Sequence, residues 1–125
     1  MGQEYLIDTN VILDFMGRKL PANSEYFISG IIDDRINISA INKIELLGFS
    51  FVEQVLIDLV DFAVLYHIDD EIIDKTIELR KKYKIKLPDA IIAATAVVHN
   101  LTLISHNFRD FQQITELNFI NSYHC

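Results

Sequence analysis

The segment EYLIDTNVIL, residues 4–13, starts with a short apolar run and then has three polar residues, Asp8, Thr9 and Asn10, in succession. A short apolar run is typical of a strand in a buried parallel sheet, and the apolar residues that return at Val11 indicate a following helix. Ligands of open parallel sheets bind outside the carboxyl ends of the strands. Because Asp8 directly follows the expected strand at 5–7, we expect it at the ligand-binding edge.

The rest of the chain alternates short β-branched runs with helical patterns. We expect strands over residues 5–7, 36–38, 64–67, 102–104 and 118–120. We expect helices over residues 11–15, 23–33, 40–47, 51–62, 69–83 and 88–99, and a short one after Phe108. This alternation predicts an α/β fold with a parallel sheet. The chain has 125 residues and no internal repeat or flexible linker, so we expect a single domain over residues 1–125.

The charge balance is acidic, with 11 Lys and Arg against 18 Asp and Glu and a formal net charge of −7. Bulk charge therefore argues against nonspecific binding to nucleic acid. Five of the basic residues lie in RKKYKIK, residues 80–86. This run is either the basic end of a helix, which the helix dipole favours, or a phosphate-binding rim. Half of the residues are hydrophobic, so we expect a partner or a second copy to cover apolar surface.

Several protein classes are excluded by missing motifs. The longest stretch of apolar and small residues, 90–98, is far shorter than the roughly 20 residues of a membrane-spanning helix. The start, MGQE, has neither the basic region of a signal peptide nor a myristoylation motif. The single cysteine, Cys125, fits a reducing cytoplasm, where we expect the protein. The histidines lack zinc spacing, and no serine-hydrolase or P-loop motif is present.

Further acids and amides fall at positions comparable to that of Asp8. Glu45 lies in INKIELLG, in the helix after the second strand, and Asp89 follows Pro88 at the head of another helix. Asn107 and Asp110 follow the fourth strand. Taken singly, Glu45 also fits an exposed helix surface and Pro-Asp an ordinary helix start, where the dipole favours an ionised carboxylate. Taken together, these residues could converge at one edge of the sheet.

In order and spacing, four segments resemble the successive motifs of the PIN domain ribonucleases, specifically the VapC-type toxins of bacterial toxin–antitoxin pairs. They are LIDTNVIL, INKIELLG, LPDAIIAATAVVHNLTLIS and HNFRDF. The resemblance extends from Tyr5 to Ile120. It implies a PIN-like three-layer α/β/α sandwich around a short parallel sheet, and a metal-dependent endoribonuclease activity.

The resemblance also implies roles for individual residues. Asp8, Glu45 and Asp89 match the three acids that hold a divalent metal in this family, and Thr9 and Asn10 match the polar pair that orients the first aspartate. Carboxylate oxygens are the hard ligands that Mg²⁺ and Mn²⁺ prefer. In a metal nuclease the ion activates a water and stabilises the oxygens of an in-line displacement at phosphorus.

The fourth position of the expected metal site is open between two residues. Either Asn107 or Asp110 could complete it, because SHN replaces the more usual Thr-Arg-Asn or Thr-x-Asp of the family. The number of carboxylates around a second metal is open for the same reason. His106 and Arg109 neighbour the site, and we expect them to contact the substrate.

The expected partners follow from the same resemblance: an RNA substrate, a second copy in a homodimer, and a small antitoxin whose tail would cover the acidic groove. Residues 49–62, FSFVEQVLIDLVDF, are our first choice for the antitoxin or dimer contact, although a core helix explains many of them equally well. One alternative is a catalytically silent PIN-fold binding module. The other is a Mg²⁺-binding receiver-like signalling domain, which lacks support because Asp8 stands alone and Ser105 and His106 follow the fourth strand.

Overall fold

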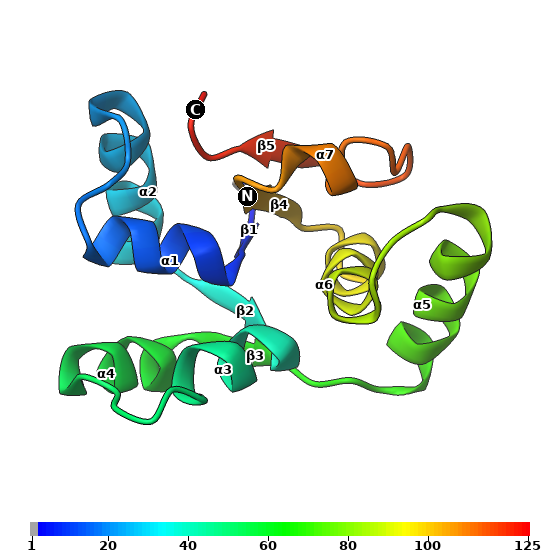
Figure 1. Ribbon diagram of the computed structural model, residues 1–125, viewed down its shortest axis with the longest axis horizontal. Coiled ribbons are helices and arrows are strands. Elements are labelled where there is room, and N and C mark those ends of the chain that lie inside the picture. The colour runs from blue at the N-terminus through cyan, green and yellow to red at the C-terminus, as the bar shows by residue number, and fades with distance from the viewer. Residues whose placement is uncertain (1–2) are drawn as a thin grey trace.

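The computed structural model describes residues 3–125 and contains a five-stranded parallel sheet (Figure 1). Its strands are β1 (Tyr5–Ile7), β2 (Asn37–Ser39), β3 (Val64–Tyr66), β4 (Thr102–Ser105) and β5 (Phe119–Asn121). All five expected strands are present, each within one residue at either end. Met1 and Gly2, which belong to the segment searched for leader and lipid motifs, lie outside the described residues.

The strands lie in the order β3-β2-β1-β4-β5, so β1 is central. Leu6 of β1 is aligned with Asn37 of β2 and with Leu103 of β4. A receiver-like domain has the order 2-1-3-4-5 instead, and the observed order therefore contradicts that alternative. Because all strands are parallel, their carboxyl ends meet at one edge of the sheet, and the residues that follow β1, β2 and β4 are brought together there.

Seven helices connect and cover the strands. They are α1 (Thr9–Met16), α2 (Ala22–Asp34), α3 (Ala40–Leu47), α4 (Gln54–Phe62), α5 (Asp70–Lys82), α6 (Leu87–Val98) and α7 (Phe108–Phe111). Two expected helix starts are wrong. The first helix begins at Thr9 rather than at residue 11, because Asp8 caps its N-terminus. The helix expected from residue 51 begins at Gln54, with Glu53 as its N-cap residue.

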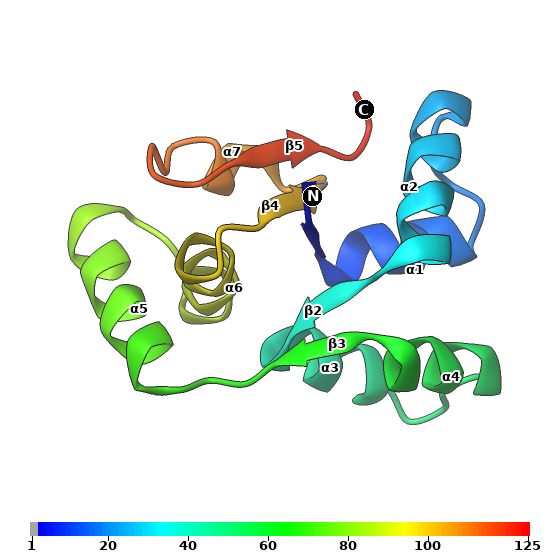
Figure 2. The same ribbon diagram turned by 180° about the vertical axis from the view of Figure 1, so that it is seen from behind.

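The core is divided by the sheet into two clusters, as expected of a three-layer sandwich. Successive side chains of a strand point to opposite faces, so Leu6 joins the cluster under α5 and α6, and Ile7 joins the cluster under α1, α2 and α4. Figure 2, which views the molecule from behind, shows these two groups of helices on opposite sides of the sheet. The α/β class and the PIN-like three-layer arrangement are thereby confirmed.

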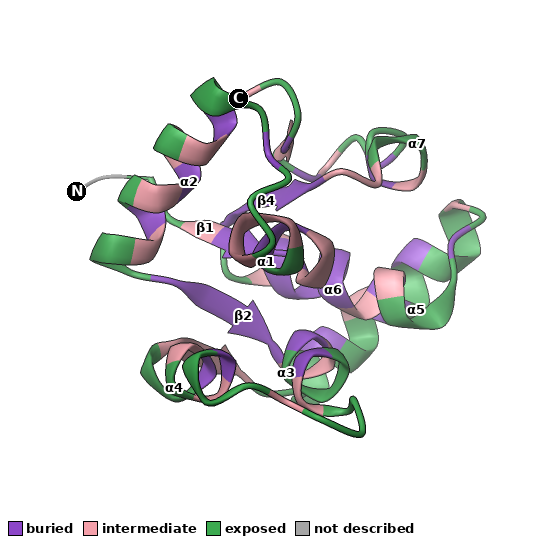
Figure 3. Cartoon of the chain, turned by 60° about the vertical axis from the view of Figure 1, so that its left-hand side comes forward, coloured by how far each residue is buried: buried purple, intermediate pink, exposed green. Residues whose placement is uncertain are grey.

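Burial follows the same layering. Figure 3 shows β2 buried along its length, whereas α2, α4 and α5 present exposed outer faces. Within residues 3–125, none of the helices is long and apolar enough to cross a membrane. Some of the large apolar residues that remain exposed lie on these outer faces, among them Tyr26 of α2 and Phe62 of α4.

Candidate active site

Asp8 is the most completely bound acid at the carboxyl edge of the sheet. It ends β1, caps α1 and is only 5% exposed. Its Oδ1 accepts hydrogen bonds from the Thr9 backbone N–H at 2.8 Å and from Asn42 Nδ2 at 3.2 Å. Its Oδ2 accepts from Ser105 Oγ at 2.7 Å and from Asn10 Nδ2 at 3.2 Å. A carboxylate has about four acceptor positions, so these donors hold both oxygens in one orientation.

Burial raises the pKa of Asp8. The hydrogen bonds from Ser105, Thr9 and Asn42 act in the opposite direction, and the negative charge of Glu45 raises the pKa further. The donors around Asp8 are all neutral, so none of them supplies the positive charge that a buried carboxylate lacks. A cation beside Asp8 would therefore stabilise its ionised form.

Glu45 is exposed on α3 and is tied to Asp8 through two neutral side chains. Its Oε1 accepts from Thr9 Oγ1 at 2.6 Å, and Thr9 Oγ1 accepts in turn from Asn42 Nδ2 at 3.1 Å. The Asn42 amide thus reaches both Thr9 and Asp8. The expectation that Thr9 orients Asp8 needs one refinement, because the Thr9 backbone binds Asp8 while its hydroxyl binds Glu45.

Asn42 is a site residue that sequence reasoning missed. It is fully buried and forms a capping box with Ser39 at the start of α3. The Ser39 backbone N–H donates to Asn42 Oδ1 at 2.9 Å, which leaves the amide nitrogen free to face Asp8. The Ser-x-x-Asn spacing in the sequence is a recognisable helix-start signal. That signal predicts the cap, but it does not predict the contact with β1.

Ser105 was also missed as a site residue, and it connects β4 to the same network. Besides donating to Asp8, its hydroxyl accepts from Asn10 Nδ2 at 3.1 Å and from the Asn107 backbone N–H at 3.0 Å. Asn107 Nδ2 donates to Asp110 Oδ2 at 3.1 Å. The two candidates for the fourth position are therefore in contact with each other, and both lie in the loop and helix that follow β4.

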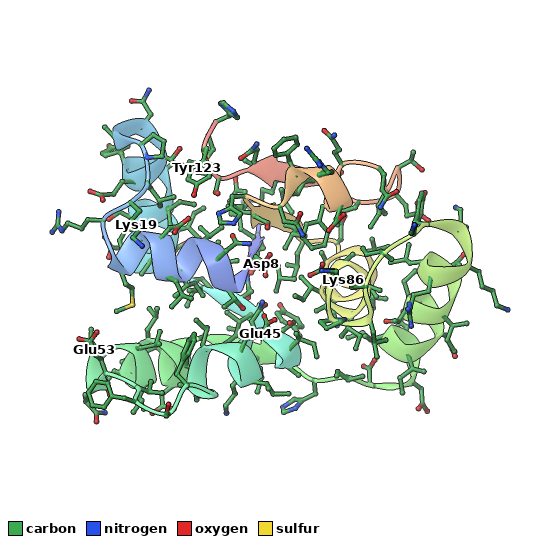
Figure 4. The ribbon with its side chains drawn as sticks, in the orientation of Figure 1. Asp8, Lys19, Glu45, Glu53, Lys86 and Tyr123 are labelled. Carbon is green, nitrogen blue, oxygen red and sulfur yellow. The ribbon has the colours of Figure 1, made fainter. Side chains whose placement is uncertain are left out.

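Asp89 lies in the first turn of α6 and is half-buried. Burial raises its pKa to about 6, and the negative charges of Asp8, Asp110 and Glu45 add to this effect, whereas Lys86 opposes it. Asp89 is therefore still largely ionised at neutral pH, as expected, but burial and repulsion outweigh the helix dipole and make its charged form less favourable than in a free aspartate. The four acids act on one another electrostatically even though they come from four different elements. Figure 4 shows Asp8, Glu45 and Lys86 around the region between α1, α3 and α6.

The residue types of the acidic cluster suit a divalent cation, but their arrangement does not form a complete cage around one. In the described chain, from residue 3 onward, no three His, Cys, Asp or Glu side chains are grouped so that they could hold a metal ion by themselves. Mg²⁺ does not need such a cage, because it keeps several waters and is usually bound through one or two carboxylates together with substrate phosphates. Mutual repulsion among the acids, seen in the raised pKa of Asp89, is what a bound cation would relieve.

The basic run 80–86 divides into residues with different surroundings. Lys82 Nζ lies 3.2 Å from Glu116 Oε2, and Tyr83 Oη donates to Glu116 Oε1 at 2.6 Å, so this part fastens the end of α5 to the loop after α7. The hydrogen bond from Tyr83 lowers the pKa of Glu116 to about 2, with a further contribution from Lys82. Lys86 is the N-cap residue of α6, and its positive charge lowers the pKa of Asp89. Lys82 therefore fits the basic end of a helix, whereas the position of Lys86 near Asp89 fits a phosphate-binding rim.

The remaining expected residues flank the acids. The His106 backbone N–H donates to Asn10 Oδ1 at 3.2 Å, and the His106 ring lies 3.2 Å from Asp14 on α1. Arg109 is exposed on α7, next to Asp110. The structure thus brings the four expected acids to one edge of the sheet, together with Thr9, Asn10, His106 and Asn107.

Comparisons with known proteins agree with this architecture. A family model of the PIN domain matches residues 5–117. A toxin–antitoxin complex from Klebsiella pneumoniae contains a similar chain, with 30% identity, 98% of this chain and 100% of that chain covered, and a TM-score of 0.79. The structure of VapBC-1 from nontypeable Haemophilus influenzae is similar at 26% identity, with 96% and 98% covered and a TM-score of 0.78. FitAcB from Neisseria gonorrhoeae is similar at 25% identity, with 97% and 99% covered and a TM-score of 0.74.

A comparison with curated proteins finds no match. The PIN domain match nevertheless includes every strand except β5 and all seven helices. It also includes every acid of the candidate active site. On this evidence, the chain belongs to the PIN domain family.

Proposed function

We propose that this protein is a metal-dependent endoribonuclease of the cytoplasm and the toxin of a toxin–antitoxin pair. The observation that carries the proposal is the cluster of four acids at the carboxyl edge of the sheet, of which Asp8 is fully oriented by neutral donors. The similar solved structures support the toxin assignment, because they are described as toxin–antitoxin or VapBC complexes.

The residues that would hold Mg²⁺ or Mn²⁺ are Asp8, Glu45 and Asp89, with Asn107 or Asp110 completing the site. Carboxylate and amide oxygens suit these hard cations. When bound, the cation supplies an activated water and stabilises charge on the oxygens that attack and leave phosphorus.

The neutral and basic side chains have their own parts in this proposal. Asn10, Asn42 and Ser105 hold Asp8 so that its oxygens do not have to reorient when the substrate binds. Lys86 and Arg109 offset the repulsion between the acids and a phosphodiester, which an acidic protein must overcome to bind RNA. No nucleophilic side chain is required.

The test is cleavage of total cellular RNA by protein purified free of antitoxin. We expect cleavage with Mg²⁺ or Mn²⁺ and none with EDTA. The Asp89→Asn variant, purified identically, should not cleave and serves as the control for contaminating nucleases. If parent and variant behave alike, whether both cleave or neither does, the nuclease proposal is refuted, and the catalytically silent binding module becomes the better explanation.

The antitoxin would bind the apolar groove between α2 and α4, whose volume is about 1050 Å³. Its apolar lining includes Met16, Tyr26, Ile32, Val55, Leu59 and Phe62. Tyr26 and Phe62 are 85% and 88% exposed, which is unusual for large apolar side chains without a partner. The segment 49–62 accordingly has two sides, because Leu56 and Val60 are buried in the core while Val55 and Phe62 face outward.

The charges around this groove indicate what the partner segment carries. Four acids and two basic residues line it: Glu25, Asp33, Asp34, Asp58, Arg18 and Arg35. An apolar segment flanked by basic residues would complement this surface. The homodimer that we also propose would use a different face, on α5, where Ile73 and Ile77 are one helical turn apart and about half exposed.

A further inference from the structure

Two aromatic rings are stacked beside the candidate active site, and one of them belongs to His106, which the sequence predicts to contact the substrate. His106, directly after β4, stacks on Tyr123, with ring centroids 5.3 Å apart and 21° between the ring planes. Both rings contact the same carboxylate oxygen of α1, because His106 Nδ1 lies 3.2 Å from Asp14 Oδ2 and Tyr123 Oη donates to that oxygen at 2.9 Å. Three elements distant in sequence therefore hold the pair in one orientation.

The pair lies close to the acids. The backbone N–H of His106 donates to Asn10, whose amide donates to Asp8. Asp14 follows Asp8 on the same helix by fewer than two turns. Figure 4 shows Asp8 at one end of α1 and Tyr123 above this helix, between α2 and the segment that follows β5. The rings therefore adjoin the hydrogen-bonded network that holds Asp8.

Both rings keep an open surface. The side chain of His106 is 36% exposed and Tyr123 is 39% exposed, although each ring already covers one face of the other. A pair that served only to fasten the end of the chain would gain more from full burial. Asp14 is by contrast mostly buried, and its carboxylate is occupied by both rings rather than turned toward solvent.

An exposed surface for base stacking would help this acidic protein to bind RNA. With a net charge of −7, the chain cannot rely on bulk attraction to RNA. Base stacking on an aromatic ring does not depend on charge, and every base has a face that can stack. Bases inside an RNA helix are stacked on one another, so only an unpaired base in a loop, bulge or single strand can reach a protein ring.

We propose that His106 and Tyr123 form a stacking platform for an unpaired base of the RNA, next to the phosphodiester at the acids. This inference rests on the proposed ribonuclease function and adds to it a binding site for a single base. Tyr123 is a binding residue in this proposal, and Asp14 is a positioning residue that acts through the two rings.

The test measures binding without cleavage, in the Asp89→Asn background. The probes are a short fluorescein-labelled single-stranded RNA of degenerate sequence and a ribose-phosphate chain of the same length without bases. We expect Tyr123→Leu to weaken binding of the first probe about ten- to hundredfold and to leave binding of the second unchanged. Because no phosphate contact is lost, the salt dependence of RNA binding should not change.

Two further variants separate stacking from a structural role. Tyr123→Phe keeps the ring and loses only the hydrogen bond to Asp14, so it should retain RNA affinity within about threefold, since most of the stacking surface remains. His99→Leu removes another exposed ring, at the opposite end of α6 from Asp89, and should leave RNA affinity unchanged.

Several outcomes overturn the platform. Equal weakening of both probes by Tyr123→Leu would do so, as would a loss of affinity in Tyr123→Phe as large as in the leucine variant. Weakened binding of the antitoxin with unchanged binding of RNA would assign the rings to the protein partner instead. If the parent cleaves RNA and all variants bind alike, only the platform fails, whereas a parent that neither binds nor cleaves RNA refutes the proposed function as well.

Discussion

Replacing Asp89 with asparagine should stabilise the metal-free protein while it abolishes cleavage. In the folded chain the pKa of Asp89 rises from 3.8 to about 6, because burial and three neighbouring acids disfavour its negative charge. The folded state therefore binds the proton more tightly than the unfolded state does. With respect to this group, stability is greatest below about pH 4 and is lost as the pH rises through about 6. At neutral pH the charged carboxylate is a cost that asparagine removes.

The free-energy cost of the charged Asp89 carboxylate follows from its raised pKa. Each unit of pKa corresponds to about 1.4 kcal/mol, which would give about 3 kcal/mol for the full change. Asp89 is only half-buried, so solvent screens part of the repulsion, and we expect about 1 to 2 kcal/mol. For a chain of this length that amounts to an increase of about 4 to 8 °C in the melting temperature at pH 7.5. At pH 4 the parent carboxyl is largely protonated and the difference should disappear.

The assay is thermal unfolding followed by circular dichroism, in EDTA, at both pH values. Asp74→Asn on α5 is the matched control, because it removes an exposed acid far from the cluster, and it should not change the melting temperature. Adding Mg²⁺ should raise the melting temperature of the parent and have less effect on Asp89→Asn, since a ligand stabilises the state that binds it. An Asp89→Asn variant that is less stable than the parent at pH 7.5 would refute the electrostatic reasoning.

Four further predictions follow from other contacts. Asn42→Ala should lower the free energy of unfolding in urea by about 1 to 3 kcal/mol, because it removes the side-chain half of the α3 capping box and the amide donor to Asp8 and Thr9. An unchanged unfolding midpoint would contradict a stabilising role for Asn42. The lowered pKa of Glu116 stabilises the fold above about pH 4.5, and this stability is lost as the pH falls through about 2. Glu116→Gln should abolish this part of the acid-induced loss of stability. Thermal unfolding of parent and variant against pH measures the effect, and identical profiles would contradict the prediction. Phe62→Asp should weaken antitoxin binding at least about tenfold in calorimetry without changing the melting temperature, because the ring is exposed in the isolated chain. Ile77→Lys should convert the dimer to a monomer in light scattering, and a persistent dimer would exclude the α5 face.

Much of the fold could be predicted from the sequence because its signals are local. Short β-branched runs and polar residues at their ends predicted all five strands, and the order of the motifs predicted which acids follow which strand. The helix starts at 11 and 51 were less well predicted. The first start depends on a side-chain cap, because Asp8 accepts from the Thr9 backbone N–H as well as from its other partners. At the second start, Glu53 makes no side-chain cap hydrogen bond.

The acids of the candidate site could likewise be predicted, but their supporting contacts could not. Asp8 and Ser105 are separated by 97 residues, and Asp8 and Asn42 by 34. A side chain that binds across strands leaves no periodic pattern in its own segment, so Asn42 was visible only as a helix cap. The stacked pair of His106 and Tyr123 was hidden for the same reason.

The sequence by itself determined the α/β class, the approximate elements and the presence of acids at strand ends, because each depends on residues close together along the chain. The tertiary structure alone decided the surroundings of each acid. The helix dipole, a local effect, favoured an ionised Asp89, whereas burial and the charges of Asp8, Asp110 and Glu45 raise its pKa to about 6. Desolvation and charge repulsion depend on distance in space, and only the parallel sheet brings these four acids together.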